Sequence, residues 1–314
     1  MWVHTFCVVT FDEDLGQKLE LQYPPVLSEN EQRAVAFLSF PDSNSFNAVG
    51  DLVYLFRMRM DSPVPLASSP ALDHTFHYGF VFFRQCRNAS KSRGYFQQSV
   101  VVITPHAYSS LFKQVVSILG PLYFDHGNST FEAAEHCIAS WPHHQPGLKV
   151  ELPLLGSVLN FFVPSPQPCQ LLSTMAEELG SILEEVDQGF PGQFQDVCLY
   201  STLGQAVCTK YLWQLWELVI TGQSVLLIAD SPALSSESVL ALISIIAPLT
   251  YSGDFRPYLT IFDVDFREFQ AQNDENAVSQ SILGTTNPFI TKMLSNWPNT
   301  LHLDHSSSGH ITVQ

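Results

Sequence analysis

Charged side chains are scarce in this sequence of 314 residues, and basic side chains are the scarcest. Asp, Glu, Lys and Arg together make up 14% of the residues, against roughly 25% in typical soluble domains. Only 14 bases oppose 30 acids, so the net charge is −16. Because nucleic acids and anionic membranes are themselves negative, this balance argues against a chain that binds either directly. We expect any membrane association to be indirect, through a partner.

Hydrophobic runs long enough to cross a membrane are also missing. The best candidate, Val239–Leu249, has 11 residues and is interrupted by Ser244 and Pro248, whereas a spanning helix needs about 20. The N-terminus has no basic segment and runs into the acidic residues 12–14, which is unlike a signal peptide. The sequence therefore favours a cytoplasmic protein.

Closely spaced cysteines are absent too. The six cysteines stand singly, without a C-x-x-C pair, so the sequence predicts neither a disulfide framework nor a zinc site. His143 and His144, with His136 upstream, are more typical of a solvated loop, because adjacent histidines seldom bind one ion together. We therefore predict no metal site and a reducing environment.

Motifs of cofactor binding and covalent catalysis do not occur. Neither G-x-G-x-x-G nor G-x-x-x-x-G-K-[ST] is found, so we predict no cofactor, and Gly222-Gln223-Ser224 lacks the second glycine of a nucleophile elbow. Asp263 and Asp265 could share one face of a strand end and hold Mg²⁺ beside a diphosphate. We favour a cap on the following helix, around Phe266–Gln270, because the helix dipole stabilises acids there. A metal-dependent transferase stays a distant alternative.

Aromatic residues, by contrast, are plentiful. The chain has 23 Phe, 10 Tyr and 5 Trp, and 46% of its residues are hydrophobic, which excludes a disordered protein. Its length is generous for one domain and comfortable for two. Trp213 and Trp216 lie on a strongly apolar predicted helix, Ala206–Ile220, and we expect both in the core rather than on a platform for a ligand.

The first part of the sequence predicts a mostly antiparallel sheet with a few helices. Runs rich in β-branched and aromatic residues predict strands at Trp2–Phe11, Lys18–Gln22, Leu52–Met60, His77–Gln85, Tyr95–Thr104 and Leu152–Val163. A capping box at Ser28 and Glu31 predicts a helix that continues to Leu38. Two further helices are expected at Tyr108–Leu119, stopped by Gly120-Pro121, and at Phe131–Ala139.

The second part alternates strands and helices. Pro164–Pro168, with three prolines in five residues, marks the boundary because proline cannot continue a helix or a central strand. Beyond it we expect strands at Val197–Tyr200, Ser224–Ala229 and Pro257–Phe262, and helices at Ala206–Ile220 and Ser236–Ala247. Such an order predicts an α/β fold with a mostly parallel, buried sheet. The expected domains are therefore residues 1–163, 164–300 and a polar tail, 301–314.

Six stretches along the chain resemble the DENN-domain family, specifically the branch called DENN domain-containing protein 6. In order, they are Phe40–Ser45, Tyr78–Gln85, Arg93–Gln97, Trp216–Val219, Asp254–Ile261 and Thr286–Phe289. Any one of these would be a weak match. Six in the right order, within a resemblance that runs from about residue 1 to about residue 300, make the similarity specific.

The resemblance implies an architecture and a function. A longin-like N-terminal lobe, residues 1–163, is expected beside an α/β C-terminal lobe, with a Rab GTPase docked across both. The implied activity is guanine-nucleotide exchange on the Rab in recycling endosomal traffic, by binding of the nucleotide-free GTPase and without covalent chemistry. Family members continue beyond Trp297-Pro298 into a helical third region. A non-catalytic Rab-binding scaffold or an inactive shortened isoform is therefore the alternative.

Seven residues within the matching motifs are our candidates for contact with the Rab. They are Asp42, Ser43 and Asn44 in the first lobe, and Asp254, Arg256, Tyr258 and Asn287 in the second. A purely structural role is open for each of them. Arg256 could pair with Asp254 or Asp263, and Asn287-Pro288 could simply form a turn.

Overall fold

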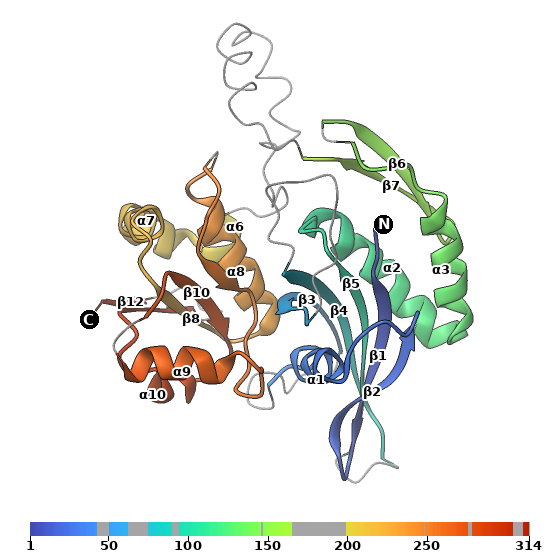
Figure 1. Ribbon diagram of the computed structural model, residues 1–314, viewed down its shortest axis with the longest axis horizontal. Coiled ribbons are helices and arrows are strands. Elements are labelled where there is room, and N and C mark those ends of the chain that lie inside the picture. Colours follow the sequence, from blue (N-terminus) through green and yellow to red (C-terminus); the bar gives the residue numbers. More distant parts are fainter. Residues whose placement is uncertain are drawn as a thin grey trace, which may run out of the picture.

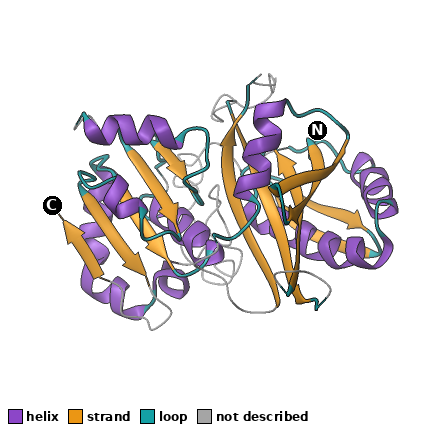
Figure 2. Ribbon diagram, turned by 90° about the horizontal axis from the view of Figure 1, so that it is seen from below, coloured by secondary structure: helices purple, strands orange, loops and turns teal. Residues whose placement is uncertain are grey.

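The chain folds into two lobes, each built around a five-stranded sheet (Figure 1). The computed structural model describes residues 1–42, 50–61, 75–89, 94–145, 147–164, 199–247, 249–275, 278–303 and 310–313. The N-terminal lobe runs from blue to green in Figure 1 and the C-terminal lobe from yellow to red. Figure 2 shows that helices flank the strands of both lobes. The predicted α/β fold class, with an antiparallel first sheet and a mostly parallel second one, is confirmed.

The sheet of the N-terminal lobe is wholly antiparallel. Its strands, in spatial order, are β2 (Gly16–Tyr23), β1 (Thr5–Asp12), β5 (Tyr95–Thr104), β4 (Phe76–Arg87) and β3 (Gly50–Arg59). Side chains alternate between its two faces, as a strand requires: Phe80 and Phe82 of β4 enter one core, whereas Val81 and Phe83 enter the other. Runs of β-branched and aromatic residues that are apolar on both faces explain why β1, β3, β4 and β5 could be predicted from sequence.

Helices cover both faces of this sheet. α1 (Glu29–Leu38) packs on one face and begins at the predicted capping box, in which Ser28 N–H donates to Glu31 Oε2 at 2.7 Å. α2 (Ser109–His126) packs on the other face, and α3 (Ser129–Ala139) packs against α2.

The predicted end of α2 at Gly120-Pro121 is wrong, because Pro121 lies inside the helix. Packing overrides the local cost of proline here. Gly120 lies so close to the Phe82 ring that any side chain at this position would overlap it. Beyond the proline, the Phe124 ring contacts Phe82 at 6.2 Å between centroids. The core contacts on both sides of Pro121 therefore hold the helix together.

The predicted single strand Leu152–Val163 is also wrong, since this segment belongs to a hairpin. β6 (Lys149–Leu154) pairs antiparallel with β7 (Ser157–Phe162) around a turn at Leu155-Gly156. Both turn residues have positive φ, 47° and 85°, which is the conformation that glycine tolerates best. The single glycine was the only local sign of this turn.

The sheet of the C-terminal lobe is parallel except at one edge. Its strands, in spatial order, are β12 (His310–Val313), β11 (Asn299–Leu303), β8 (Val225–Ala229), β10 (Ser281–Thr285) and β9 (Asp254–Arg256). Only β12 pairs antiparallel. Every residue of β8 and β10 is buried, as expected for strands covered on both faces. The accompanying helices are α6 (Leu199–Leu203), α7 (Gln205–Ile220), α8 (Pro232–Ser244), α9 (Phe266–Asp274) and α10 (Ile290–Met293).

Four predictions for this lobe differ from the structure. Leu199 and Tyr200 are helical rather than a strand, while residues 197 and 198 lie outside the described part. None of the residues in the expected strand Pro257–Phe262 is in a strand: the observed strand, residues 254–256, ends just before them, because Pro257 has no N–H for the strand ladder. The expected polar tail contributes residues 301–303 and 310–313 to the sheet edge. Trp213, expected in the core, is 74% exposed.

The two lobes share one hydrophobic core. α8 packs against β3 of the other lobe, and a single cluster of buried side chains extends from Leu55 and Tyr78 to Val239, Ile243 and Phe255. The division at residues 163 and 164 stays a prediction, because most of the proline-rich segment, residues 165–168, lies outside the described residues. In the part of the chain that the structure describes, no helix is both long and apolar enough to span a bilayer.

Candidate functional site at the lobe junction

Charged residues of opposite sign meet where β3 of the first lobe faces β9 of the second. Arg57 Nη1 lies 2.6 Å from Asp254 Oδ1 and also donates to the Phe255 carbonyl at 3.2 Å. The Arg57 side chain is buried, and that of Asp254 is partly exposed. A charge-assisted hydrogen bond with so little solvent around it is among the stronger polar contacts in proteins.

Arg256 extends this pair into a network. Its Nε donates to Asp254 Oδ2 at 3.1 Å and its Nη2 to Asp265 Oδ2 at 2.6 Å. Arg59, on the same face of β3 as Arg57, completes it with contacts of 3.6 Å to Asp265 and to Glu268. Three arginines from two lobes thus alternate with three carboxylates of the C-terminal lobe.

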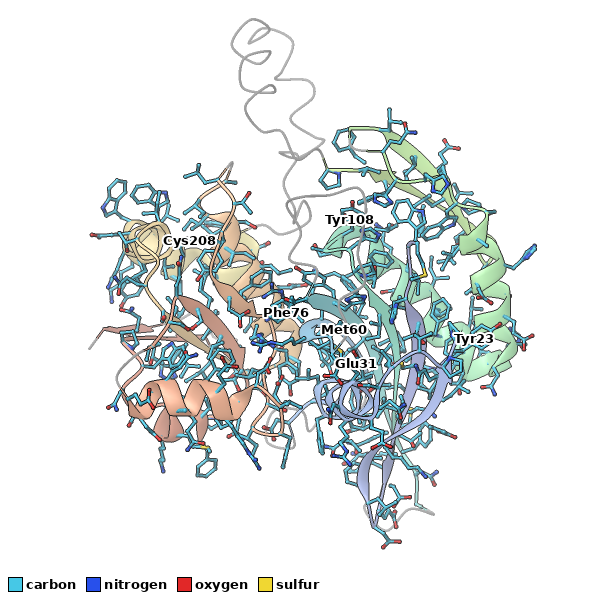
Figure 3. All side chains as sticks on the ribbon, viewed as in Figure 1. Tyr23, Glu31, Met60, Phe76, Tyr108 and Cys208 are labelled. Atoms are coloured by element: carbon cyan, nitrogen blue, oxygen red, sulfur yellow. The ribbon has the colours of Figure 1, made fainter. Side chains whose placement is uncertain are left out.

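Phe76, at the start of β4, lies in the middle of these arginines. The guanidinium carbons of Arg57, Arg256 and Arg59 lie 3.7, 4.8 and 5.7 Å from the centroid of its ring. A cation over an aromatic face is attracted by the ring quadrupole, most strongly when it is desolvated. Figure 3 shows Phe76 between the two lobes. Its contacts with the three arginines offset part of the desolvation free energy that burying these cations costs.

The buried carboxylates and cations alter each other's acidity. Burial raises the pKa of Asp263 to about 6, although the nearby Arg256 opposes this shift. For Arg256, burial works against the charge, but Asp254, Asp263 and Asp265 outweigh it and raise the pKa further. Arg256 is only 1% exposed. It therefore stays a cation inside the protein because carboxylates surround it.

The two aspartates considered for Mg²⁺ have internal partners instead. Asp263 Oδ1 accepts the N–H of Asp265 at 2.9 Å, and Asp265 pairs with Arg256. Asp265 does occupy the N-cap position of α9, but its side chain makes no capping hydrogen bond, so the favoured capping role is wrong for this residue. Across the residues that the structure describes, no group of three His, Cys, Asp or Glu side chains is placed to hold a metal ion.

Tyr258 makes a second connection between the lobes. This fully buried residue accepts the N–H of Asp42 at 3.0 Å and donates its hydroxyl to the Phe40 carbonyl at 3.2 Å. Its ring meets that of Tyr54 edge-on, with centroids 5.4 Å apart. Burial raises the pKa of the Tyr258 hydroxyl well above its usual value, so it acts here as a neutral hydrogen-bonding group.

Four of the seven predicted site residues therefore meet at the junction: Asp42, Asp254, Arg256 and Tyr258. Asn287 forms the turn that we considered as its alternative role, since its Oδ1 accepts the N–H of Phe289 at 3.0 Å. Ser43 and Asn44 lie outside the described residues. The anticipated ion pair of Arg256 with Asp254 is confirmed. Contact of these seven residues with a partner stays a prediction.

Three junction residues escaped the sequence analysis: Arg57, Arg59 and Phe76. Their signal was present, because two arginines at alternate positions of an apolar strand place two cations on one otherwise hydrophobic face. Because buried cations need partners, the sequence indicates that Arg57 and Arg59 pair with carboxylates. It does not indicate which carboxylates, because Asp254 is 197 residues away from Arg57.

The outer edge of the junction carries exposed side chains of mixed character. Phe262 stacks on Phe37 of α1, with ring centroids 5.1 Å apart, and is 57% exposed. Val264 is 61% exposed, and Arg59 and Glu268 are about half exposed. We call these five residues the junction rim. Exposed apolar residues beside charged ones are typical of a surface that binds another protein.

Comparison with known proteins agrees with the resemblance seen in the sequence motifs. The model of the DENN (AEX-3) domain family matches residues 95–264. The DENND6 homolog of Dictyostelium discoideum is 37% identical over 96% of this chain and 49% of its own length. DENND6A of Gallus gallus and DENND6B of Homo sapiens are 36% and 35% identical over the whole chain and 55% of their own lengths. The chain thus spans about half the length of these relatives.

Proposed function

The chain belongs to the DENN-domain family and is DENND6-like, and from this membership we propose that it is a guanine-nucleotide exchange factor for a Rab GTPase. The structural observation that supports the proposal is the junction rim. It presents exposed apolar and charged side chains from both lobes, and the network beneath it holds the lobes together. The Rab would dock across the two lobes at this rim.

Exchange of this kind requires binding and no covalent chemistry. A protein that binds the nucleotide-free GTPase more tightly than the nucleotide-bound form weakens nucleotide binding by the same factor. A 10⁴-fold effect needs a preference of about 5.5 kcal/mol. Such a preference favours a preformed surface, because ordering a flexible one would consume part of the binding free energy.

The buried network supplies that preformed surface in our proposal. Arg57, Arg256 and Tyr258 each connect the lobes from inside, so their role is to fix the orientation of the rim. Phe262, Val264 and Arg59 are the exposed side chains that would contact the GTPase. Asp42, which is partly exposed beside Tyr258, would extend the contact surface on the first lobe.

Endosomal recycling in the cytoplasm is the setting we propose for this activity. The net charge of −16 would repel anionic lipid. Recruitment of the protein to the membrane is therefore assigned to its partner.

A Rab-binding scaffold without exchange activity is the second candidate. It is favoured by one observation, the span of about half the length of the DENND6 relatives. The transferase alternative has lost its structural support, because Asp263 and Asp265 bind a backbone N–H and Arg256.

Release of a fluorescent guanine nucleotide from a panel of purified Rab proteins tests the proposal. We expect the chain to accelerate release from at least one Rab and to bind that Rab best without nucleotide. Binding without acceleration would establish the scaffold. If no Rab of the panel binds this chain, although each Rab releases its nucleotide when Mg²⁺ is chelated, the proposal fails for this chain.

A further inference from the structure

Helix α7 has an exposed apolar face that the lobe junction does not explain. It lies on the side of the C-terminal lobe away from the N-terminal lobe (Figure 1). One side of the helix is in the core through Val207, Leu215, Leu218 and Val219. Figure 3 shows Cys208, which is also buried, on the same helix. The opposite side faces solvent, although the apolar side chains of a helix on a globular protein are normally turned toward the core.

Aromatic and aliphatic side chains dominate the exposed face. Trp213 is 74% exposed, Leu212 44% and Ile220 39%. The Trp213 and Trp216 rings stack on each other, with centroids 5.1 Å apart and planes at 29°. Exposed tryptophans in a contiguous patch mark an interaction surface more often than chance exposure, because tryptophan dominates the energetics of interfaces.

The spacing of this face is that of a helix–helix seam. Thr209, Trp213, Trp216 and Ile220 are separated by four, three and four residues, which matches the a and d positions of a heptad repeat. Residues of such a seam lie along one stripe of a helix and pack against the same stripe of a partner helix. The partner should therefore be a helix of similar pattern.

Two charged residues beside the seam indicate that the partner helix is a second copy of α7. Lys210 and Glu217 are both exposed and stand seven residues apart, so they lie on the same side of the stripe. Neither forms an ion pair with another residue in the described ranges of the chain. If a second copy of α7 runs antiparallel with Trp213 opposite its Trp216, Lys210 of each copy comes beside Glu217 of the other. The face is thus complementary to itself in the spacing of its apolar residues and in charge.

We propose that the outer face of α7 binds the same face of a second copy of this chain, as an antiparallel, two-fold symmetric helix pair. Isologous contacts of this kind are the commonest way in which soluble proteins form dimers. A 16-residue helix is about 24 Å long at 1.5 Å per residue. Two such stripes, even with tryptophans that bury about 150–250 Å² each, form a small interface, so the dimer is weak and depends on concentration.

Analytical ultracentrifugation of the whole chain tests the proposal, with loading concentrations from about 5 to about 200 μM, around the micromolar affinities expected of small interfaces. We expect the average mass to rise from monomer toward dimer across this range. Trp213→Glu should abolish the rise. Lys149→Glu is the control for a change of charge, because Lys149 is an exposed residue of β6, outside the seam. It should leave dimerisation nearly unchanged.

A charge exchange identifies the partner and its direction. Lys210→Glu and Glu217→Lys should each weaken dimerisation about tenfold, because each places two pairs of like charges at the seam. An equimolar mixture of these two variants should dimerise more tightly than either alone, since the antiparallel pairing then brings opposite charges together. Circular dichroism would show that the variants keep their fold.

Three results would overturn the proposal. They are a monomer at every concentration, self-association that Trp213→Glu does not change, and a mixture of the two charge variants no tighter than its components. The last result would mean that another helix or another protein occupies the face. None of these outcomes depends on exchange activity, so the test is independent of the proposed function.

Discussion

Arg57 and Asp254 are 197 residues apart in the sequence and belong to different lobes, yet their side chains share a hydrogen bond of 2.6 Å. The pair joins strand β3 to strand β9 across the junction between the lobes. Its arginine is buried and its carboxylate also serves Arg256. The single carboxylate of Asp254 thus balances two buried cations.

Replacing Asp254 with Ala should lower the free energy of unfolding by about 3 kcal/mol, because removing one member of a buried ion pair leaves its partner charged and unpaired. Urea denaturation of both proteins measures the difference. Asp51→Ala is the control, because Asp51 pairs with Arg84 in a partly exposed position and should cost less than about 1 kcal/mol. Equal losses in the two variants would show that the junction network contributes no more than a surface ion pair.

Replacing Val264 with Asp should reduce Rab binding at the junction rim by about tenfold or more and leave stability nearly unchanged. An exposed apolar side chain that becomes buried on binding cannot be replaced by a charge without a desolvation cost. Val158→Asp is the matched control, since Val158 of β7 is 60% exposed and Val264 is 61% exposed. If Val264→Asp and Val158→Asp reduce Rab binding and exchange by the same factor, the Rab does not bind at the junction rim.

The pH dependence of stability should change when Asp263 is replaced by Asn. The pKa of Asp263 is raised to about 6 in the folded protein, so the folded state binds this proton more tightly than the unfolded state does. The contribution of Asp263 to stability is therefore present at low pH and is lost as the pH rises from about 4 through 6. The amide of the Asp263→Asn variant is neutral throughout, so this variant should gain on the order of 2 kcal/mol relative to the parent between pH 4 and pH 7.5. Urea unfolding at both pH values measures this gain, and a constant difference would show that Asp263 titrates normally.

The contribution of buried His77 to stability should depend on pH in the opposite direction: it is lost as the pH falls. Burial lowers its pKa to about 4, with a smaller effect from nearby His4, whose ring centroid is 4.9 Å away. Below about pH 6.5 the unfolded chain takes up a proton that the folded protein refuses, so stability falls as the pH falls toward 4. We expect His77→Phe to remove about 2 kcal/mol of the loss between pH 8 and pH 5. Thermal unfolding at the two pH values checks this, and parallel pH profiles of the two proteins would refute it.

Sequence patterns predicted those elements that carry a local signal in their own residues. The run of aromatic and β-branched residues in β4 and the capping box at Ser28 and Glu31 are local signals, and the structure confirms both elements. The patterns failed where distant residues decide. α2 continues through Pro121 because the Phe82 ring from another element packs against it, and no local rule contains that information.

In the candidate site, too, the residues with a local signal could be predicted and the contacts between distant residues could not. The motif around Asp254 and Arg256 was found through its resemblance to a family, and the structure brings both residues to the lobe junction. Their connection to Arg57 could not be predicted, because nothing local indicates which strand of one lobe faces which strand of the other. Trp213 was misplaced for a related reason: an apolar helix predicts burial, but the sequence does not say whether the chain itself covers all of its faces.

The hydrophobic core shared by the lobes has a consequence for how this protein can change over time. Tyr78 of the first lobe and Phe255 of the second have ring centroids 6.5 Å apart within that core. A substitution on one side therefore alters the packing on the other, and accommodating changes should arise in pairs across the lobes. Exchange of one lobe for that of a distant homologue would separate such pairs, so the two lobes should be inherited together.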